Sequence, residues 1–136
     1  MRYLAIDYGS GRTGLAICAP TETLVSPLAV IRGQKALVAK ISELVATEAV
    51  EAVVLGLPLN MDGSQGSQAK VVFRFAERLK ANLDIPVYFQ DERLSSFGAE
   101  QRFSAAELTR AERKKPLDAV AAAEILEAFL EHKKAL

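Results

Sequence analysis

The chain opens with short apolar runs that are separated by segments containing glycine or proline. Residues 3–6 and 15–19 are two such runs on either side of a Gly-Ser-Gly turn, which predicts a β-hairpin with largely buried strands. Residues 24–31 alternate more loosely and contain Pro27, a pattern typical of an edge strand. The first part of the chain therefore predicts three antiparallel strands.

Apolar residues recur at helical spacing in two later segments. Residues 34–48 predict one helix, and Ser64 or Ser67 is a suitable cap for a second. The second helix is expected to bury one stripe of side chains: Ala69, Val72, Phe73, Ala76 and Leu79. The fully apolar residues 52–57 are typical of a central parallel strand, and residues 86–90 predict another strand.

The last part of the chain alternates between helical and charged segments. A short helix is expected over residues 95–103, followed by a charged loop at 104–115. Pro116 suits the first position of a final helix over residues 117–132. Taken together, the elements predict an α/β fold: a mixed five-stranded sheet, antiparallel and then parallel, with helices on both faces.

Composition limits the possible organisation and environment. With 136 residues, half of them hydrophobic, the chain is expected to form a single domain over 1–136. Seventeen basic and seventeen acidic residues cancel, so any site for a polyanion must be local. The single cysteine, Cys18, lies in an apolar strand and fits a reducing compartment, and no apolar run approaches the about 20 residues that span a bilayer. We expect a soluble cytoplasmic protein.

Asp7 follows the first predicted strand. An ionised aspartate is costly to bury without a partner, and the nearby Gly9 and Gly11 allow a close backbone approach. This pattern suggests a bound cation or phosphate. The alternative is that Asp7 only caps the turn through its own backbone, and the hairpin alone does not decide between the two.

Two further acids, Asp91 and Glu92, follow the strand predicted at 86–90. Alternation along a strand sends them to opposite faces, so only one of them can readily point toward Asp7. The pattern does not choose between them. In the alternative interpretation this is an exposed strand end, where Asp91 pairs with Arg93.

Asp118 is more informative, because it occupies a face of the final helix that is otherwise apolar. Its neighbours on that face are Ala121, Ala122, Ile125 and Phe129. An acid in a first helical turn also complements the helix dipole, but that role does not explain the choice of face. Carboxylates gathered at one sheet edge repel one another unless cations neutralise them. Such oxygen ligands select Mg²⁺ or Mn²⁺, and a two-metal site suits hydrolysis at phosphorus.

Other kinds of site have little support in the sequence. The only histidine, His132, is expected at a solvated helix end beside Lys133. There is no cluster of cysteine and histidine for zinc, no Walker loop and no Gly-x-Ser-x-Gly motif.

Four motifs together resemble one known family. They are Asp7-x-Gly-x-x-Arg12-x-Gly, residues 56–63 (Gly-Leu-Pro-Leu-Asn-Met-Asp-Gly), residues 91–95 (Asp-Glu-Arg-Leu-Ser) and residues 115–122 (Lys-Pro-Leu-Asp-Ala-Val-Ala-Ala). In order and spacing they are similar to the YqgF family, also called RuvX. The resemblance implies an RNase H-like fold related to the Holliday junction resolvase RuvC. It also implies a nuclease that matures the 5′ end of pre-16S rRNA.

The resemblance assigns roles to particular residues. It implies that Asp7, Glu92 and Asp118 are the catalytic, metal-binding acids, with Asp91 the less favoured neighbour. It implies substrate or structural contacts at four matching positions: Arg12, Asn60, Arg93 and Lys115. Lys114 is a further candidate for binding phosphate. Two departures from the family pattern are Ser95-Ser96 in place of a common threonine, and a short charged loop before Pro116.

We therefore expect a divalent-metal-dependent nuclease that acts on precursor rRNA, with ribosomal particles as further candidate partners. Resolution of branched DNA is the alternative implied by kinship with RuvC, and it would require a homodimer rather than a monomer. Two other classes remain open. One is ATP-dependent phosphotransfer of the sugar-kinase and actin-like type, and the other is a non-catalytic module that binds RNA or ribosomes.

Overall fold

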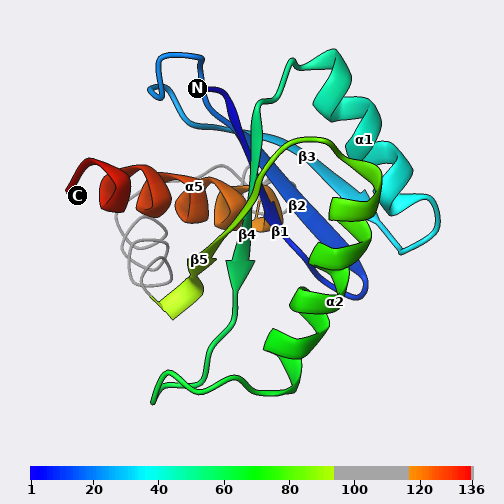
Figure 1. Ribbon diagram of the computed structural model, residues 1–136, viewed down its shortest axis with the longest axis vertical. Helices are drawn as coiled ribbons and strands as arrows, with labels where there is room; N and C mark the ends of the chain where they lie inside the picture. The colour runs from blue at the N-terminus through cyan, green and yellow to red at the C-terminus, as the bar shows by residue number, and fades with distance from the viewer. Residues whose placement is uncertain (94–116, 136) are drawn as a thin grey trace.

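The computed structural model describes residues 1–93 and 117–135, and in these residues five strands form one mixed sheet (Figure 1). The strands are β1 (Tyr3–Asp7), β2 (Arg12–Ile17), β3 (Ser26–Arg32), β4 (Ala52–Leu57) and β5 (Val87–Asp91). Their spatial order is β3-β2-β1-β4-β5, in which β1, β2 and β3 pair antiparallel, whereas β4 runs parallel to both β1 and β5. The mixed sheet expected from the sequence is confirmed.

Helices cover both faces of the sheet. The helices α1 (Leu37–Thr47) and α2 (Ser67–Asn82) lie on one side, and α5 (Leu117–Ala135) lies on the other (Figure 1). Each face has its own apolar core. The first is built around Ile6, Leu55 and Phe75, and the second around Ala5, Val54 and Leu126. Because α5 contacts all five strands, its position relative to the sheet is closely determined.

Local details of α2 differ from the sequence-based expectations. Gly66 occupies the N-cap position and makes no side-chain cap bond, so neither predicted serine caps the helix. Phe75, and not Phe73, is fully buried, because it stacks on Tyr8 with ring centroids 4.0 Å apart. Phe73 is half-buried and packs edge-on against Phe89 instead.

Other boundaries shift by a few residues. The third strand begins at Ser26, and α5 continues three residues past the expected end at His132. The helix expected at 95–103 and the charged loop at 104–115 lie outside the described residues. In the part of the chain that the structure describes, no helix has the length and apolar character needed to cross a membrane.

The topology brings several strand ends to one edge of the sheet. The carboxyl ends of β1, β4 and β5 lie there, since these strands are parallel. The register pairs Leu57 of β4 with Asp91 of β5, and Asp7 of β1 with Gly14 of β2. Ligand sites of parallel sheets form beyond these ends. The loop between β4 and α2 extends beyond the same edge (Figure 1).

Candidate active site

Two carboxyl groups meet at this edge. Asp7 ends β1 and Glu92 follows β5, and their side chains are hydrogen-bonded although β4 lies between the two strands. Gly56 of β4 makes this possible. A Cβ atom on Gly56 would lie 2.6 Å from Oε1 of Glu92, so the missing side chain leaves the space through which Glu92 reaches Asp7.

The contact changes the acidity of both groups. Burial, and then the charge of Asp7, raises the pKa of Glu92 to about 8. Burial also raises the pKa of Asp7, and the charge of Asp118 raises it further, while the bond to Glu92 opposes the shift. At neutral pH Glu92 therefore keeps a proton and donates it to the Asp7 carboxylate. Such a shared proton marks a pair of acids held closer than two free charges would tolerate.

Asp118 stands in the first turn of α5, beside this pair. Its Oδ2 lies 3.3 Å from Nε of Arg12. The start of the helix approaches β2 closely at Gly14, which has no side chain. A Cβ atom there would lie 2.0 Å from the Asp118 carbonyl oxygen. Since Gly14 pairs with Asp7 in the sheet, this contact places Asp118 near enough for its charge to act on Asp7.

The three acids are not gathered into a closed cluster. Within residues 1–93 and 117–135, no group of three carboxylate, histidine or cysteine side chains is arranged to hold a metal ion. Asp7 and Glu92 share a proton, and Asp118 pairs with Arg12. The structure thus brings two of the predicted acids into contact and the third to the same edge.

Asp91 has a different partner. Its carboxylate accepts bonds from Arg93 Nε at 3.1 and 3.0 Å and from Arg93 Nη2 at 2.7 Å. These bonds hold the pKa of Asp91 below its usual range. The geometry therefore selects Glu92 as the partner of Asp7, a choice that strand alternation left open. The reason is local: β5 ends at Asp91, and Glu92 already belongs to a helical turn.

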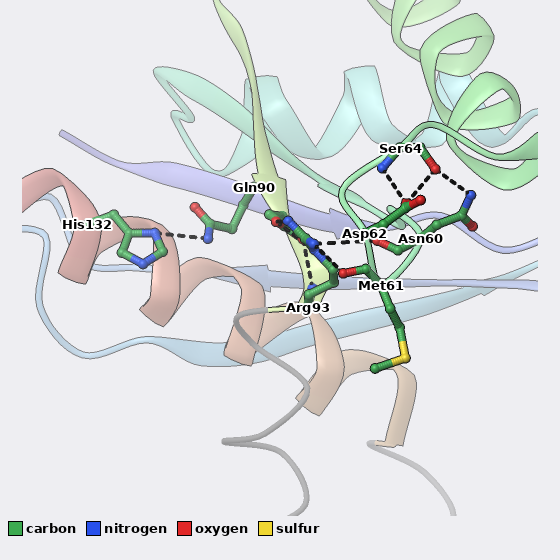
Figure 2. A network of polar contacts seen from close by, with 8 residues as sticks. Asn60, Met61, Asp62, Ser64, Gln90, Arg93 and His132 are labelled. Carbon is green, nitrogen blue, oxygen red and sulfur yellow. Dashed lines mark hydrogen bonds and ion pairs between the residues drawn. The ribbon is translucent and has the colours of Figure 1, made fainter.

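Arg93 also connects the end of β5 to the loop after β4 (Figure 2). Its Nη1 donates to the carbonyl of Met61 at 3.0 Å and to that of Asn60 at 3.4 Å. Asn60 itself donates through Nδ2 to Ser64 Oγ at 3.0 Å. Both predicted substrate contacts in this region, Asn60 and Arg93, are thus engaged in bonds within the protein. Of the other three predicted contacts, Arg12 pairs with Asp118, and Lys114 and Lys115 lie outside the described residues.

Sequence reasoning missed Gln34, which holds the turn after Asp7. Its Nε2 donates to the carbonyls of Gly9 at 2.9 Å and Ser10 at 3.1 Å, and its Oε1 accepts a bond from the Tyr8 hydroxyl at 2.7 Å. Because Tyr8 also stacks on Phe75, this network ties the turn to α2. A polar residue just after a predicted edge strand carried no signal of that role.

His132 is exposed at the end of α5, as expected, but it has a partner on the sheet (Figure 2). Its Nδ1 lies 3.1 Å from Nε2 of the buried Gln90. This bond joins α5 to β5 one residue before Asp91. It is a structural link rather than part of the acid pair.

Comparison with known proteins identifies similar sequences over nearly the whole chain. The family model described as "RuvX: Holliday junction resolvase" matches residues 1–132. A protein of Roseiflexus sp. (strain RS-1), named "Putative pre-16S rRNA nuclease", is 38% identical over 135 residues, covering 98% of this chain and 96% of that protein. A protein of the same name from Caldanaerobacter subterraneus subsp. tengcongensis is 39% identical over 137 residues, covering 98% of this chain and 99% of that protein.

A solved structure supports the fold. The RuvC of T. thermophilus, in complex with a Holliday junction substrate, superposes with a TM-score of 0.65 over 98% of this chain and 96% of that one. The two sequences are only 18% identical, so this likeness bears on the fold alone. The match to the family model and the two relatives, by contrast, extend over nearly the whole sequence. This chain is a member of the RuvX family.

Proposed function

We propose that this protein is a nuclease that hydrolyses phosphodiester bonds in the precursor of 16S rRNA, acting in the cytoplasm. The relatives that share nearly its full length are named for that activity. One observation carries the assignment of the site: Asp7 and Glu92 meet at the carboxyl edge of the sheet with the pKa of Glu92 raised to about 8. Titratable groups perturbed in this way are typical of active sites.

The chemistry of the donor set suits a divalent cation, although the three acids are not arranged in the described residues to hold one before it binds. Asp7, Glu92 and Asp118 offer carboxylate oxygens at one edge, and burial together with the neighbouring acids raises the pKa of Asp7 and Glu92. Hard oxygen ligands of this kind select Mg²⁺ or Mn²⁺. A pair of such ions, when bound, supplies activation of the attacking water and stabilisation of the leaving oxygen. We assign the three acids as its ligands.

The chain's own residues prepare this edge for a phosphate. Glu92 holds the proton that it must release before its carboxylate can serve as a ligand. Arg12 is 55% exposed beside Asp118, where its guanidinium can also bind a phosphate oxygen. Gln34 holds the turn that connects Asp7 to Arg12.

Removing one carboxylate tests the proposal. We expect Asp7→Asn to lower Mn²⁺- or Mg²⁺-dependent cleavage of a precursor RNA spanning the 5′ end of 16S rRNA by at least about a hundredfold. The melting temperature should not fall, because the substitution removes a buried charge and the amide oxygen of asparagine can still accept the bond from Glu92. Asp84→Asn is the matched control, since Asp84 is exposed just before β5, at the other end of that strand. Full cleavage by the Asp7 variant would contradict the mechanism.

Resolution of branched DNA is the second candidate. It is favoured by the description of the family model and by the fold shared with a RuvC bound to a Holliday junction. Four-way DNA junctions in the same assay, together with the mass of the protein in solution, separate the two candidates, because symmetric resolution needs a homodimer. RNA binding that persists in EDTA without any metal-dependent cleavage would instead indicate a non-catalytic module for RNA or ribosomal particles.

A further inference from the structure

Met61 is the most exposed large apolar side chain in the described residues. It is 96% exposed at the tip of the loop between β4 and α2, and its side chain points away from the polar contacts of that loop (Figure 2). A single exposed apolar residue is common on protein surfaces and needs no explanation by itself. Met61 is of interest because hydrogen bonds within the loop and from Arg93 hold its backbone in place.

The turn around Met61 is closed by hydrogen bonds on both sides. The backbone N–H of Asn60 donates to the carbonyl of Ser64 at 2.9 Å, and that of Gly63 donates to the carbonyl of Asn60 at 2.8 Å. Ser64 donates to Asp62 Oδ1 through its N–H at 2.9 Å and its hydroxyl at 2.6 Å. The turn therefore presents Met61 from a fixed frame and loses little freedom when a partner binds.

Arg93 fixes this frame relative to the acid pair. It donates to the Met61 carbonyl through Nη1 and to the Asp91 carboxylate through Nε and Nη2. Since Arg93 directly follows Glu92, the backbone of Met61 is tied to the segment that carries the shared proton. A group bound at Met61 is thus held at a set distance from Asp7 and Glu92.

The chemistry of the tip disfavours a phosphate. The Arg93 guanidinium is turned to Asp91 and to backbone carbonyls. The bonds from Ser64 lower the pKa of Asp62, so that carboxylate stays ionised beside Met61. A negative charge repels phosphate, whereas a polarizable thioether packs well on a flat, uncharged ring. Methionine is among the residues that insert against bases in nucleic-acid complexes.

We propose that Met61 packs against a nucleobase of the substrate strand, and that Arg93 holds this contact in register with Asp7 and Glu92. The inference rests on the proposed nuclease function and adds how the strand is positioned. The ligand class is an unstacked base of RNA, because a base inside a continuous helix has no free face to offer.

Protection from oxidation tests the contact directly. The chain has two methionines, and Met1, 40% exposed at the opposite end of the sheet, is an internal reference for Met61. Wild-type protein in EDTA is treated with hydrogen peroxide, with and without the precursor RNA, and each sulfoxide is measured by mass spectrometry. We expect RNA to slow oxidation of Met61 about tenfold and that of Met1 by less than about twofold. RNA with abasic sites should give little protection.

Substitutions supply the second measurement. Met61→Ser should weaken binding of the same RNA in EDTA about tenfold, and Met61→Leu should stay within about twofold of wild type. Leu24→Ser is the matched control, because Leu24 is 83% exposed in the loop after β2, at the other end of the sheet. All three variants change exposed side chains, so their melting temperatures should be unchanged.

Several outcomes would overturn the inference. These are equal oxidation of Met61 with and without RNA, no binding of the RNA at all, and protection that abasic RNA reproduces. Protection by ribosomal proteins free of RNA, and not by the precursor RNA, would assign Met61 to a protein partner instead. Binding and protection are measured in EDTA, and cleavage is measured separately with Mg²⁺ or Mn²⁺. A protected Met61 in a protein that cuts no RNA with either metal would overturn the nuclease function and leave the base contact standing.

Discussion

The two ends of the sheet differ in the partners of their carboxyl groups. At the end where β1 begins, opposite charges are paired. Arg2 Nη2 lies 3.3 Å from Glu48, and Glu22 pairs with both Lys133 and the N-terminal ammonium group of Met1. At the end where β1 stops, Asp118 and Asp91 also pair with arginines, but Asp7 and Glu92 share a proton with each other.

The pKa values record this difference. The bond to Lys133 lowers the pKa of Glu22, as expected for an acid with a partner. Burial raises the pKa of Glu92 to about 8, although the same fold provides cations elsewhere. Folding stability explains the first arrangement and not the second. An acid that shares a proton with another acid, rather than pairing with a cation, is typical of an active site.

The largest effect should come from moving α5 away from the acid edge. We expect Gly14→Ala to lower the free energy of unfolding by about 1–3 kcal/mol, because the new methyl group would meet the Asp118 backbone. Chemical denaturation measures the change. Gly11→Ala in the same hairpin is the control, since no atom lies within 4 Å of a Cβ atom built there. Equal losses in both variants would show that α5 does not rest on Gly14.

A pH series should sharpen the contrast between the ends. Folded Glu92 keeps its proton to about pH 8, whereas an ordinary glutamate loses it near 4.5, so the folded state binds more protons between these values. The melting temperature in EDTA should therefore fall as the pH rises through this window. Glu92→Gln stays neutral, and we expect it to fall less and to be a few degrees more stable than wild type above pH 8. Glu131→Gln, exposed on α5, should follow wild type.

The smallest expected effect is a decrease in melting temperature, opposite to the increase expected for Glu92→Gln. Glu22→Gln removes the partner of Lys133 at the paired end, so thermal unfolding should show a slightly lower melting temperature. The ion pair is exposed, and salt should abolish the difference. A rise in stability, as expected for Glu92→Gln, would mean that the two ends do not differ in the way described.

The sheet and its helices could be predicted because local patterns determine them. Residues 52–57 have one plausible structure, a buried strand, and β4 has those bounds. Helical spacing alone is less decisive within α2. Phe73 and Phe75 both lie near the apolar stripe, and stacking on Tyr8, a contact between distant segments, selects Phe75 for the core.

The acids were found in the sequence, but their geometry was not. Strand alternation could not choose between Asp91 and Glu92, because the strand ends between them. Their positions depend instead on what neighbouring elements lack or offer: Gly56 leaves room for Glu92, and Arg93 takes Asp91. Gln34 left no signal, because two of its bonds run to backbone carbonyls, which every residue type possesses, and the third joins it to Tyr8, 26 positions away in the sequence.

The docking of α5 on all five strands has a consequence for the timing of activity. Asp118 comes late in the chain, whereas Asp7 emerges from the ribosome almost at once. A growing polypeptide can complete the hairpin and both parallel strands while the edge still lacks its third carboxylate. The proposed three-acid edge is therefore complete only after α5 has packed on the sheet.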